Sequence, residues 1–126
     1  MTLAIQSGRD AVRETVLTKA TLSAADRLGL SARTLAEAIG VSEASISRMK
    51  RGTSLLATGT KPFELAALLV RIFRSLDAIA GGDSNTVRGW LGAQNMALGG
   101  RPVDRITSVQ GLVDVATYLD ARRAAL

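Results

Sequence analysis

Residues 31–52, SARTLAEAIGVSEASISRMKRG, constrain the fold more than any other stretch of the chain. Two short segments with helical spacing of apolar residues are each preceded by a serine that can cap a helix, Ser31 and Ser42. Each segment is followed by a glycine, Gly40 or Gly52, and glycine takes the left-handed conformation of a helix end at no steric cost. The pattern predicts two short helices joined by a tight turn.

Apolar residues in the two segments fall on one side of each expected helix. Leu35 and Ile39 face inward in the first helix, and Ile46 and Met49 face inward in the second. Ala36 stands where the helices cross, and a larger side chain there would push them apart. Caps, glycines and apolar spacing therefore agree on a helix-turn-helix. The alternative is an ordinary helical hairpin with a solvated basic face.

The outward side of the second helix is basic toward its C-terminal end. Such a helix fits the major groove of DNA, with its N-terminal residues at base edges and its C-terminal cations near phosphates. We expect Glu43 and Ser45 near base edges, and Arg48 at a base or a phosphate. The residues that we expect at operator DNA are Arg33, Ser42, Glu43, Ser45, Ser47, Arg48, Lys50, Arg51 and Lys61. Because Glu43 repels phosphate and Ala44 is small, a helix-turn-helix that serves only as a scaffold is the alternative.

Composition limits the classes of function. With only 3% aromatic residues, the core has to be mostly Ala, Leu, Val and Ile, a mixture that favours helices. The formal net charge of +5 suits a nucleic-acid partner, although many solvated surfaces carry as much. Cysteine and histidine are both absent, which removes disulfides, the commonest zinc sites and the likeliest general base. We therefore expect no enzyme activity, no metal and no cofactor.

Two apolar stretches are too short or too charged to be a targeting or membrane segment. The start, MTLAIQSGRD, has too short an apolar run for a signal peptide. The most apolar later stretch, residues 63–80, is interrupted by four charged residues and does not fit a membrane span. We expect a cytoplasmic protein with no membrane contact.

The remaining sequence also has helical spacing, and we predict an all-α fold. We expect residues 1–9 to be loose, with a helix beginning near Asp10 that is bent or interrupted at residues 21–23. A long helix covers residues 63–80, and Pro62 is placed to start it. The expected inward side of the first helix comprises Val12, Val16, Leu17 and Ala20.

Gly81 and Gly82 divide the chain into a part for DNA, residues 1–82, and a second part, residues 83–126. Short helices are expected in the second part, followed by a last helix capped by Thr107 or Ser108. Its expected apolar side comprises Val109, Leu112, Val113, Ala116 and Leu119. Aspartates are scattered here and no glycine-rich phosphate loop follows a strand, so the residues alone indicate a helical appendage.

Longer motifs add a resemblance that covers the chain from about Asp10 to its end. Trp-Leu, then QNMALGGRP, then a Gly-Leu-Val helix ending in YLDARR, resembles the C-terminal domain of Xre/MbcA/ParS-type antitoxins. Upstream, GVSEASISRMKRG followed by KPFELAALLVRIFRSLDAIAGG resembles the Xre-like N-terminal half of the same family. One departure is Gln94, where the family pattern has a proline before the asparagine.

The resemblance implies an antitoxin of a type II toxin–antitoxin pair. Its partner would be a RES-domain toxin, an enzyme that degrades NAD⁺, and the C-terminal part would cover the toxin's active site. The helix-turn-helix would let the complex repress its own operon. Because helix-turn-helix units usually bind paired half-sites as dimers, we expect a homodimer.

The resemblance also assigns residues to the toxin-facing surface. Carried over to this chain, that surface includes Trp90, Leu91, Asn95, Leu98, Gly99, Gly100, Arg101 and Pro102. The residues approaching the toxin mouth would be Tyr118, Asp120, Arg122 and Arg123. An arginine there would pair with toxin carboxylates or take the place of the substrate's cation partners. For Arg122 and Arg123, a solvated helix end favoured by the helix dipole is an equal alternative.

A second function stays open at this point. The chain would then be a stand-alone DNA-binding repressor whose C-terminal half dimerises or binds a small ligand. A toxin gene beside this one, or capture of its product by the chain, would distinguish the two functions.

Overall fold

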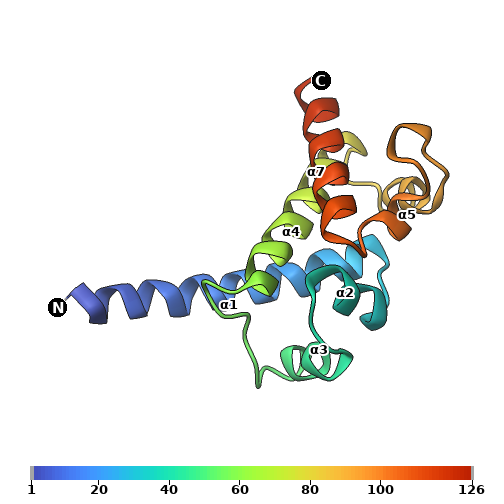
Figure 1. The fold of residues 1–126 in the computed structure, drawn as a ribbon. Coiled ribbons are helices and arrows are strands. Elements are labelled where there is room, and N and C mark those ends of the chain that lie inside the picture. The colour runs from blue at the N-terminus through green and yellow to red at the C-terminus, as the bar shows by residue number, and fades with distance from the viewer. Residues whose placement is uncertain (1, 126) are drawn as a thin grey trace.

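The computed structural model describes the backbone of residues 2–125 and the side chains of residues 5–125. In that range the fold is all-α, as predicted, with seven α-helices and one short 3₁₀ helix (Figure 1). In chain order the elements are α1 (Thr2–Leu28), α2 (Ala32–Ile39), α3 (Glu43–Lys50), α4 (Lys61–Ile79), α5 (Ser84–Gly92), η1 (Met96–Leu98), α6 (Pro102–Arg105) and α7 (Val109–Ala124).

Helix α4 is the centre of the fold. It packs against α1 and α2, which precede it in the sequence, and against α5 and α7, which follow it (Figure 1). Its residues Leu69 and Ile72 are completely buried in a core cluster that runs from Ala25 to Leu119. The two parts expected on either side of Gly82 therefore share one core, because α4 packs against helices of both parts.

Helix α1 is longer than the sequence indicated. The predictions of a loose stretch before Asp10 and of a break at residues 21–23 are wrong, because the helix is continuous from Thr2 to Leu28. The hydroxyl of Thr21 donates to the carbonyl of Leu17 at 2.7 Å, so this side chain is satisfied inside the helix and does not interrupt it. Residue 1 of the expected loose stretch lies outside the described range.

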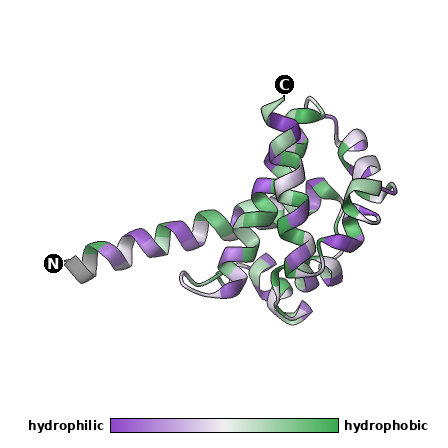
Figure 2. Cartoon of the chain, turned by 45° about the horizontal axis from the view of Figure 1, so that its top comes forward, coloured by the Kyte–Doolittle hydropathy of each residue, from purple (hydrophilic) through white to green (hydrophobic). Residues whose placement is uncertain are grey.

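The predicted inward side of α1 is wrong at Val12 and Val16, whereas Leu17 and Ala20 are half-buried and Leu17 packs against the core. Val12 and Val16 are 63% and 59% exposed, whereas Thr18, Thr21 and Leu28 are buried. The first half of α1 extends away from the rest of the molecule as an arm, on which hydrophobic and hydrophilic residues alternate in bands (Figures 1 and 2). The apolar side chains of the arm are therefore exposed to solvent in the single chain.

Two polar side chains of α1 hold the connector between α3 and α4. The carboxylate of Glu14 accepts from the backbone N–H of Thr58 at 2.7 Å, and the hydroxyl of Thr18 accepts from that of Leu56 at 2.9 Å. Both bonds join residues about forty positions apart in the sequence. They fix the course of the connector that leads away from α3.

Helix α7 begins at a crowded junction with α6. Ser108 caps α7 by accepting from the N–H of Gly111 at 3.1 Å. An added Cβ at Gly111 would lie 1.8 Å from the carbonyl oxygen of Arg105, so only glycine fits there. The predicted inward positions Val109 and Val113 are wrong: they are 61% and 40% exposed. Val115 is buried in their place because α7 packs on α4 along Leu112, Val115, Ala116 and Leu119.

Candidate functional site

Helices α2 and α3 form the predicted helix-turn-helix. The hydroxyl of Ser31 accepts from the N–H of Thr34 at 3.1 Å and starts α2, and Ser42 caps α3 in the same way through Ser45. Gly40 ends α2 in the left-handed region, with φ of 74°. These predicted caps and the predicted turn are confirmed.

The inward faces of the two helices are also confirmed. Leu35, Ala36 and Ile39 of α2 and Ile46 and Met49 of α3 are all at most 5% exposed. Burial of these five side chains fixes how α3 is rotated about its axis. Its opposite face is consequently presented to solvent, at the edge of the molecule away from α7 (Figure 1).

The exposed face of α3 carries cations that have no acidic partner. The guanidinium of Arg48 donates to the hydroxyl of Ser45 at 3.0 Å, and that of Arg51 donates to Ser47 at 2.9 Å. Among the ion pairs of the described residues, none involves Arg48, Lys50 or Arg51. Their charge is therefore available to phosphates. Glu43 is exposed at the opposite, N-terminal end of the helix.

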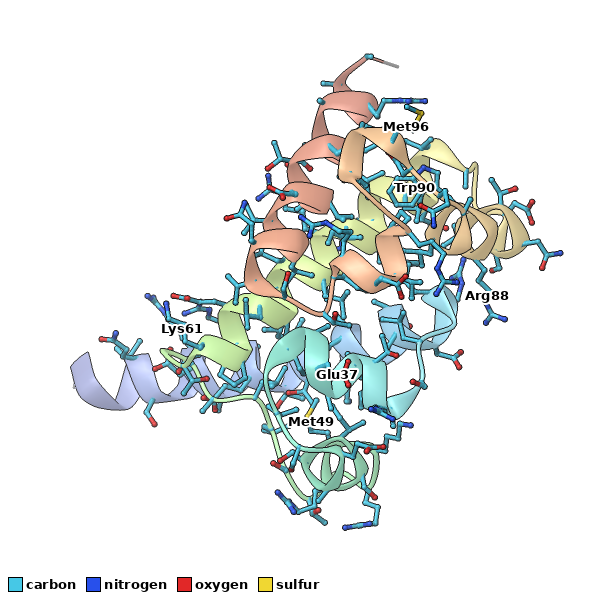
Figure 3. All side chains as sticks on the ribbon, turned by 45° about the vertical axis from the view of Figure 1, so that its right-hand side comes forward. Glu37, Met49, Lys61, Arg88, Trp90 and Met96 are labelled. Carbon is cyan, nitrogen blue, oxygen red and sulfur yellow. The ribbon has the colours of Figure 1, made fainter. Side chains whose placement is uncertain are left out.

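Two of the residues expected at DNA have a different setting. Arg33 pairs with Glu37 along α2 at 3.3 Å, and Lys61 pairs with Glu64 along α4 at 3.1 Å. Lys61 stands at the start of α4, on the side of the molecule where the arm leaves, rather than on α3 (Figure 3). Lys61 therefore lies apart from the surface of α3. We call that surface the α3 face, and it comprises Glu43, Ser45, Ser47, Arg48, Lys50 and Arg51.

A second surface is built around an aromatic pair. The rings of Trp90 in α5 and Tyr118 in α7 are stacked, with centroids 6.0 Å apart and planes inclined by 23°. The guanidinium of Arg122 lies over the Tyr118 ring at 5.8 Å and donates to its hydroxyl at 3.1 Å. Tyr118 therefore contacts both an aromatic ring and a cation.

A hydrogen-bonded hairpin after α5 carries an exposed apolar side chain. Asn95 and Gly100 are joined by two backbone hydrogen bonds, of 3.1 and 3.2 Å, and the Asn95 side chain accepts from the N–H of Leu98. Between them Met96 is 99% exposed, at the start of η1, which follows the helix of Trp90 in the sequence (Figure 3). A shallow groove of about 420 Å³ separates η1 from α7 and is lined by Ala97, Leu98, Asp114, Thr117 and Tyr118. We call Trp90, Met96, Tyr118 and this groove the aromatic face.

Sequence reasoning missed Met96. Methionine usually fills gaps in a core, so its identity alone predicts burial. The indication was its position, directly after the capping Asn95 in a turn closed by Gly99, whose φ is 71°. In so short a turn, no neighbouring element packs over the side chain of the first residue, which is Met96.

Several residues expected on the toxin-facing surface lie beneath it or are already paired. Leu91, Leu98 and Pro102 are buried, so their side chains pack beneath the exposed residues and are not accessible to a partner. Arg101 pairs with Asp104 at 3.0 Å. Gly99, Arg122 and Arg123 are exposed, whereas Gly100 is half-buried in the hairpin.

Asp120 is engaged within the chain. It accepts from the guanidinium of Arg71 and, at 3.4 Å, from the hydroxyl of Ser75. The hydrogen bond from Arg71 holds the pKa of the Asp120 carboxyl below its ordinary value. In this structure Asp120 fastens α7 to α4.

Other kinds of site find no support in residues 2–125. That part of the chain contains no cluster of three or more side chains suited to a metal ion. It also contains no helix long and apolar enough to cross a membrane.

Comparison with family models covers nearly all of the chain. Residues 8–76 match the model described as the antitoxin Xre-like helix-turn-helix domain. The chain belongs to the Xre-like antitoxin family. Residues 75–124 of this antitoxin match the model of the antitoxin Xre/MbcA/ParS C-terminal toxin-binding domain. No curated protein matches the chain.

The two matched domains correspond to the two surfaces. The α3 face lies in the helix-turn-helix match, and the aromatic face lies in the toxin-binding match. The matches meet at residues 75–76, inside α4, the helix that contributes to both sides of the core. The antitoxin is therefore a toxin-binding protein with a DNA-binding type of fold, carried on a single core.

Proposed function

We propose that this antitoxin neutralises a RES-domain toxin that degrades NAD⁺ by covering the toxin's active site, and that it represses its own operon as a homodimer. The chain resembles antitoxins with such partners, and it carries two surfaces of different chemistry on one core. The α3 face has exposed cations, whereas the aromatic face joins the exposed Met96 to Trp90 and Tyr118, which are half-buried against the core. The observation on which the proposal mainly rests is the aromatic face, because it lies within the matched toxin-binding domain.

The aromatic face has the properties of a protein-binding surface. Interface hot spots are enriched in Trp, Tyr and Arg, and buried aromatic anchors supply most of the binding energy. Here Trp90, Tyr118 and Arg122 are held together by stacking and by a cation–π contact. The 99% exposed Met96 stands on a hairpin closed by its own hydrogen bonds, so little ordering cost is added when it enters a toxin pocket.

The end of α7 supplies the cations for the toxin mouth. Arg123 is exposed and forms no ion pair with another described residue, so its guanidinium is available to a toxin carboxylate. Arg122 is already oriented by Tyr118. In this proposal Asp120 positions the helix end through Arg71 and does not itself contact the toxin.

The α3 face supports operator binding. Arg48 is held by Ser45 on the side of α3 that is open to the major groove, with Lys50 and Arg51 near the flanking phosphates. Cations without acidic partners exchange counterions for phosphate contacts, so binding should weaken steeply as salt rises. Two copies are needed to read two half-sites.

A growth assay with reciprocal variants tests the proposal. The toxin encoded beside this gene is expressed with intact antitoxin, with Met96→Asp or with Arg48→Ala, and NAD⁺ is measured in the same cells. We expect Arg48→Ala to protect as well as the intact chain. Met96→Asp places a carboxylate in the apolar contact and should fail to protect, while NAD⁺ falls. Equal protection by both variants, or a neighbour that leaves NAD⁺ unchanged, would contradict the proposal.

A further inference from the structure

Helices α1 and α4 form a groove of about 570 Å³ that is part of neither the α3 face nor the aromatic face. Its apolar walls include Val16 and Leu17 of α1 and Phe63 and Val70 of α4. Val12 and Val16 are 63% and 59% exposed, and they continue the apolar surface onto the part of α1 that extends from the body as an arm (Figure 1). We call this surface the α1–α4 groove.

The lining of the α1–α4 groove is basic as well as apolar, and it contains no acidic residue. The four arginines that line it are Arg13, Arg71, Arg74 and Arg123. Arg71 is hydrogen-bonded to Asp120, and Arg13 lies 3.8 Å from Asp10. Arg74 and Arg123 form no ion pair with another described residue. Two positive charges at the groove are therefore left without an acidic partner.

This combination of apolar walls and unpaired arginines favours an occupant that is both apolar and acidic. Covering the apolar surface removes it from water, and carboxylates form charge-assisted hydrogen bonds with guanidinium groups. A DNA duplex would bring phosphates to the arginines but would leave the apolar walls uncovered. A second copy of this chain, with its net charge of +5, would bring more positive charge to the groove.

The walls of the groove fit a helix better than an extended segment. Both walls are helices, whose backbone N–H and C=O groups bond within the helix, so the groove offers no ladder of partners to a strand. A third helix satisfies its own backbone and can place a row of apolar side chains between the other two. Along α4, the distance from Phe63 to Arg74 is about 16 Å, which corresponds to about three helical turns of an occupant.

We propose that the α1–α4 groove binds an amphipathic, acidic helix of a partner protein. The apolar side of this helix lies between α1 and α4, and its aspartates or glutamates lie beside Arg74 and Arg123. The inference concerns a third surface and does not depend on the toxin or the operator. Because Arg123 is also expected at the toxin mouth, the test variants change Arg74 and Val16, which the proposed function does not use.

Fluorescence anisotropy with the full chain and two labelled peptides gives the first test. One peptide is a helix of about 15 residues, long enough to be partly helical alone, with a stripe of leucines flanked by glutamates. The matched peptide has lysine at every glutamate. The chain should bind the glutamate peptide about 10-fold or more tightly than the lysine peptide. Equal affinities, or a preference for lysine, overturn the inference.

Charge reversal at Arg74 tests whether the peptide lies in the groove. Arg74→Glu should weaken binding of the glutamate peptide about 10-fold and should strengthen binding of the lysine peptide. Lys50→Glu changes the net charge equally but lies on α3, outside the groove, and should leave both affinities unchanged. Equal effects of the two variants would mean attraction to net charge alone and overturn the inference.

A carboxylate in the apolar wall gives the last test. Val16→Asp should abolish binding of the glutamate peptide, because it places a charge where leucines enter. Val113→Asp changes an exposed valine of α7 outside the groove and should have no effect. Circular dichroism checks that both variants are folded. Unchanged binding by Val16→Asp overturns the inference.

Two control measurements on the same samples exclude other occupants. If Arg74→Glu weakens binding of a random-sequence duplex but not of the glutamate peptide, the groove binds DNA and the inference is wrong. If sedimentation equilibrium shows a dimer of the intact chain that Val16→Asp separates, the groove binds a second copy and the inference is likewise wrong.

Discussion

Gly111 makes the tightest backbone approach among the chain's helical glycines, and Gly111→Ala should destabilise the protein strongly. The added Cβ would lie 1.8 Å from the carbonyl oxygen of Arg105 and 2.6 Å from its carbon, whereas real Cβ atoms essentially never come within 3.0 Å. Backbone atoms cannot rotate away as a flexible side chain does. The junction between α6 and α7 has to open by more than 1 Å.

The expected cost follows from what the opening disturbs. Overpacking of this kind costs about 1–3 kcal/mol. Displacing Ser108, whose hydroxyl caps α7 through the N–H of Gly111, adds about 1 kcal/mol. Alanine recovers about 0.5–1 kcal/mol of helix propensity. The free energy of unfolding should therefore fall by about 1–3.5 kcal/mol, which lowers Tm by about 5–15 °C for a domain of this size.

Gly89→Ala is the matched control. Gly89 also lies inside a helix, α5, but a Cβ added there meets nothing within 4 Å. The same substitution should raise the free energy of unfolding by about 0.5–1 kcal/mol. Urea unfolding followed by circular dichroism measures both variants. Equal effects of the two substitutions would refute the packing argument.

Three further variants test other contacts. Thr18→Val removes the acceptor of a buried connector N–H and should cost about 1–3 kcal/mol in urea unfolding, whereas Thr21→Val, whose hydroxyl only donates within α1, should cost far less. Arg71 lowers the pKa of Asp120 below its ordinary value of 3.8, so the pair's contribution to stability is present above pH 3.8 and is lost as pH falls through the lowered pKa. Asp120→Asn should therefore lower the free energy of unfolding at pH 7 and flatten its decrease at acid pH. An unchanged decrease at acid pH would argue against the pairing. Arg48→Ala should weaken operator binding about 10-fold or more in a gel shift at fixed salt without changing Tm, and unchanged affinity would reject the contact.

The helix-turn-helix could be predicted from the sequence because its determinants are local. Capping serines, the left-handed glycine and a period of apolar residues each act within a few positions, and the structure has them where the sequence placed them. The break after α4 and the cap of α7 by Ser108 follow for the same reason.

The features that were missed depend on distant contacts. Val113 and Val115 have the same propensity, and only the packing of α7 on α4 decides that Val115 is buried. The need for glycine at position 111 comes from a carbonyl in the preceding helix. Val12 and Val16 have the spacing of a buried stripe, yet nothing in a single chain covers them. Local periodicity shows that a face is apolar but not what packs against it.

The central claim is that the α3 face and the aromatic face serve two partners at once. The direct measurement is a native gel of labelled operator duplex with the antitoxin, titrated with toxin up to an equal amount. We predict that the protein–DNA band moves to slower mobility as toxin is added, that Met96→Asp prevents only this second shift, and that Arg48→Ala weakens the first. Release of free duplex by equimolar toxin, or loss of both shifts in either variant, would contradict the account.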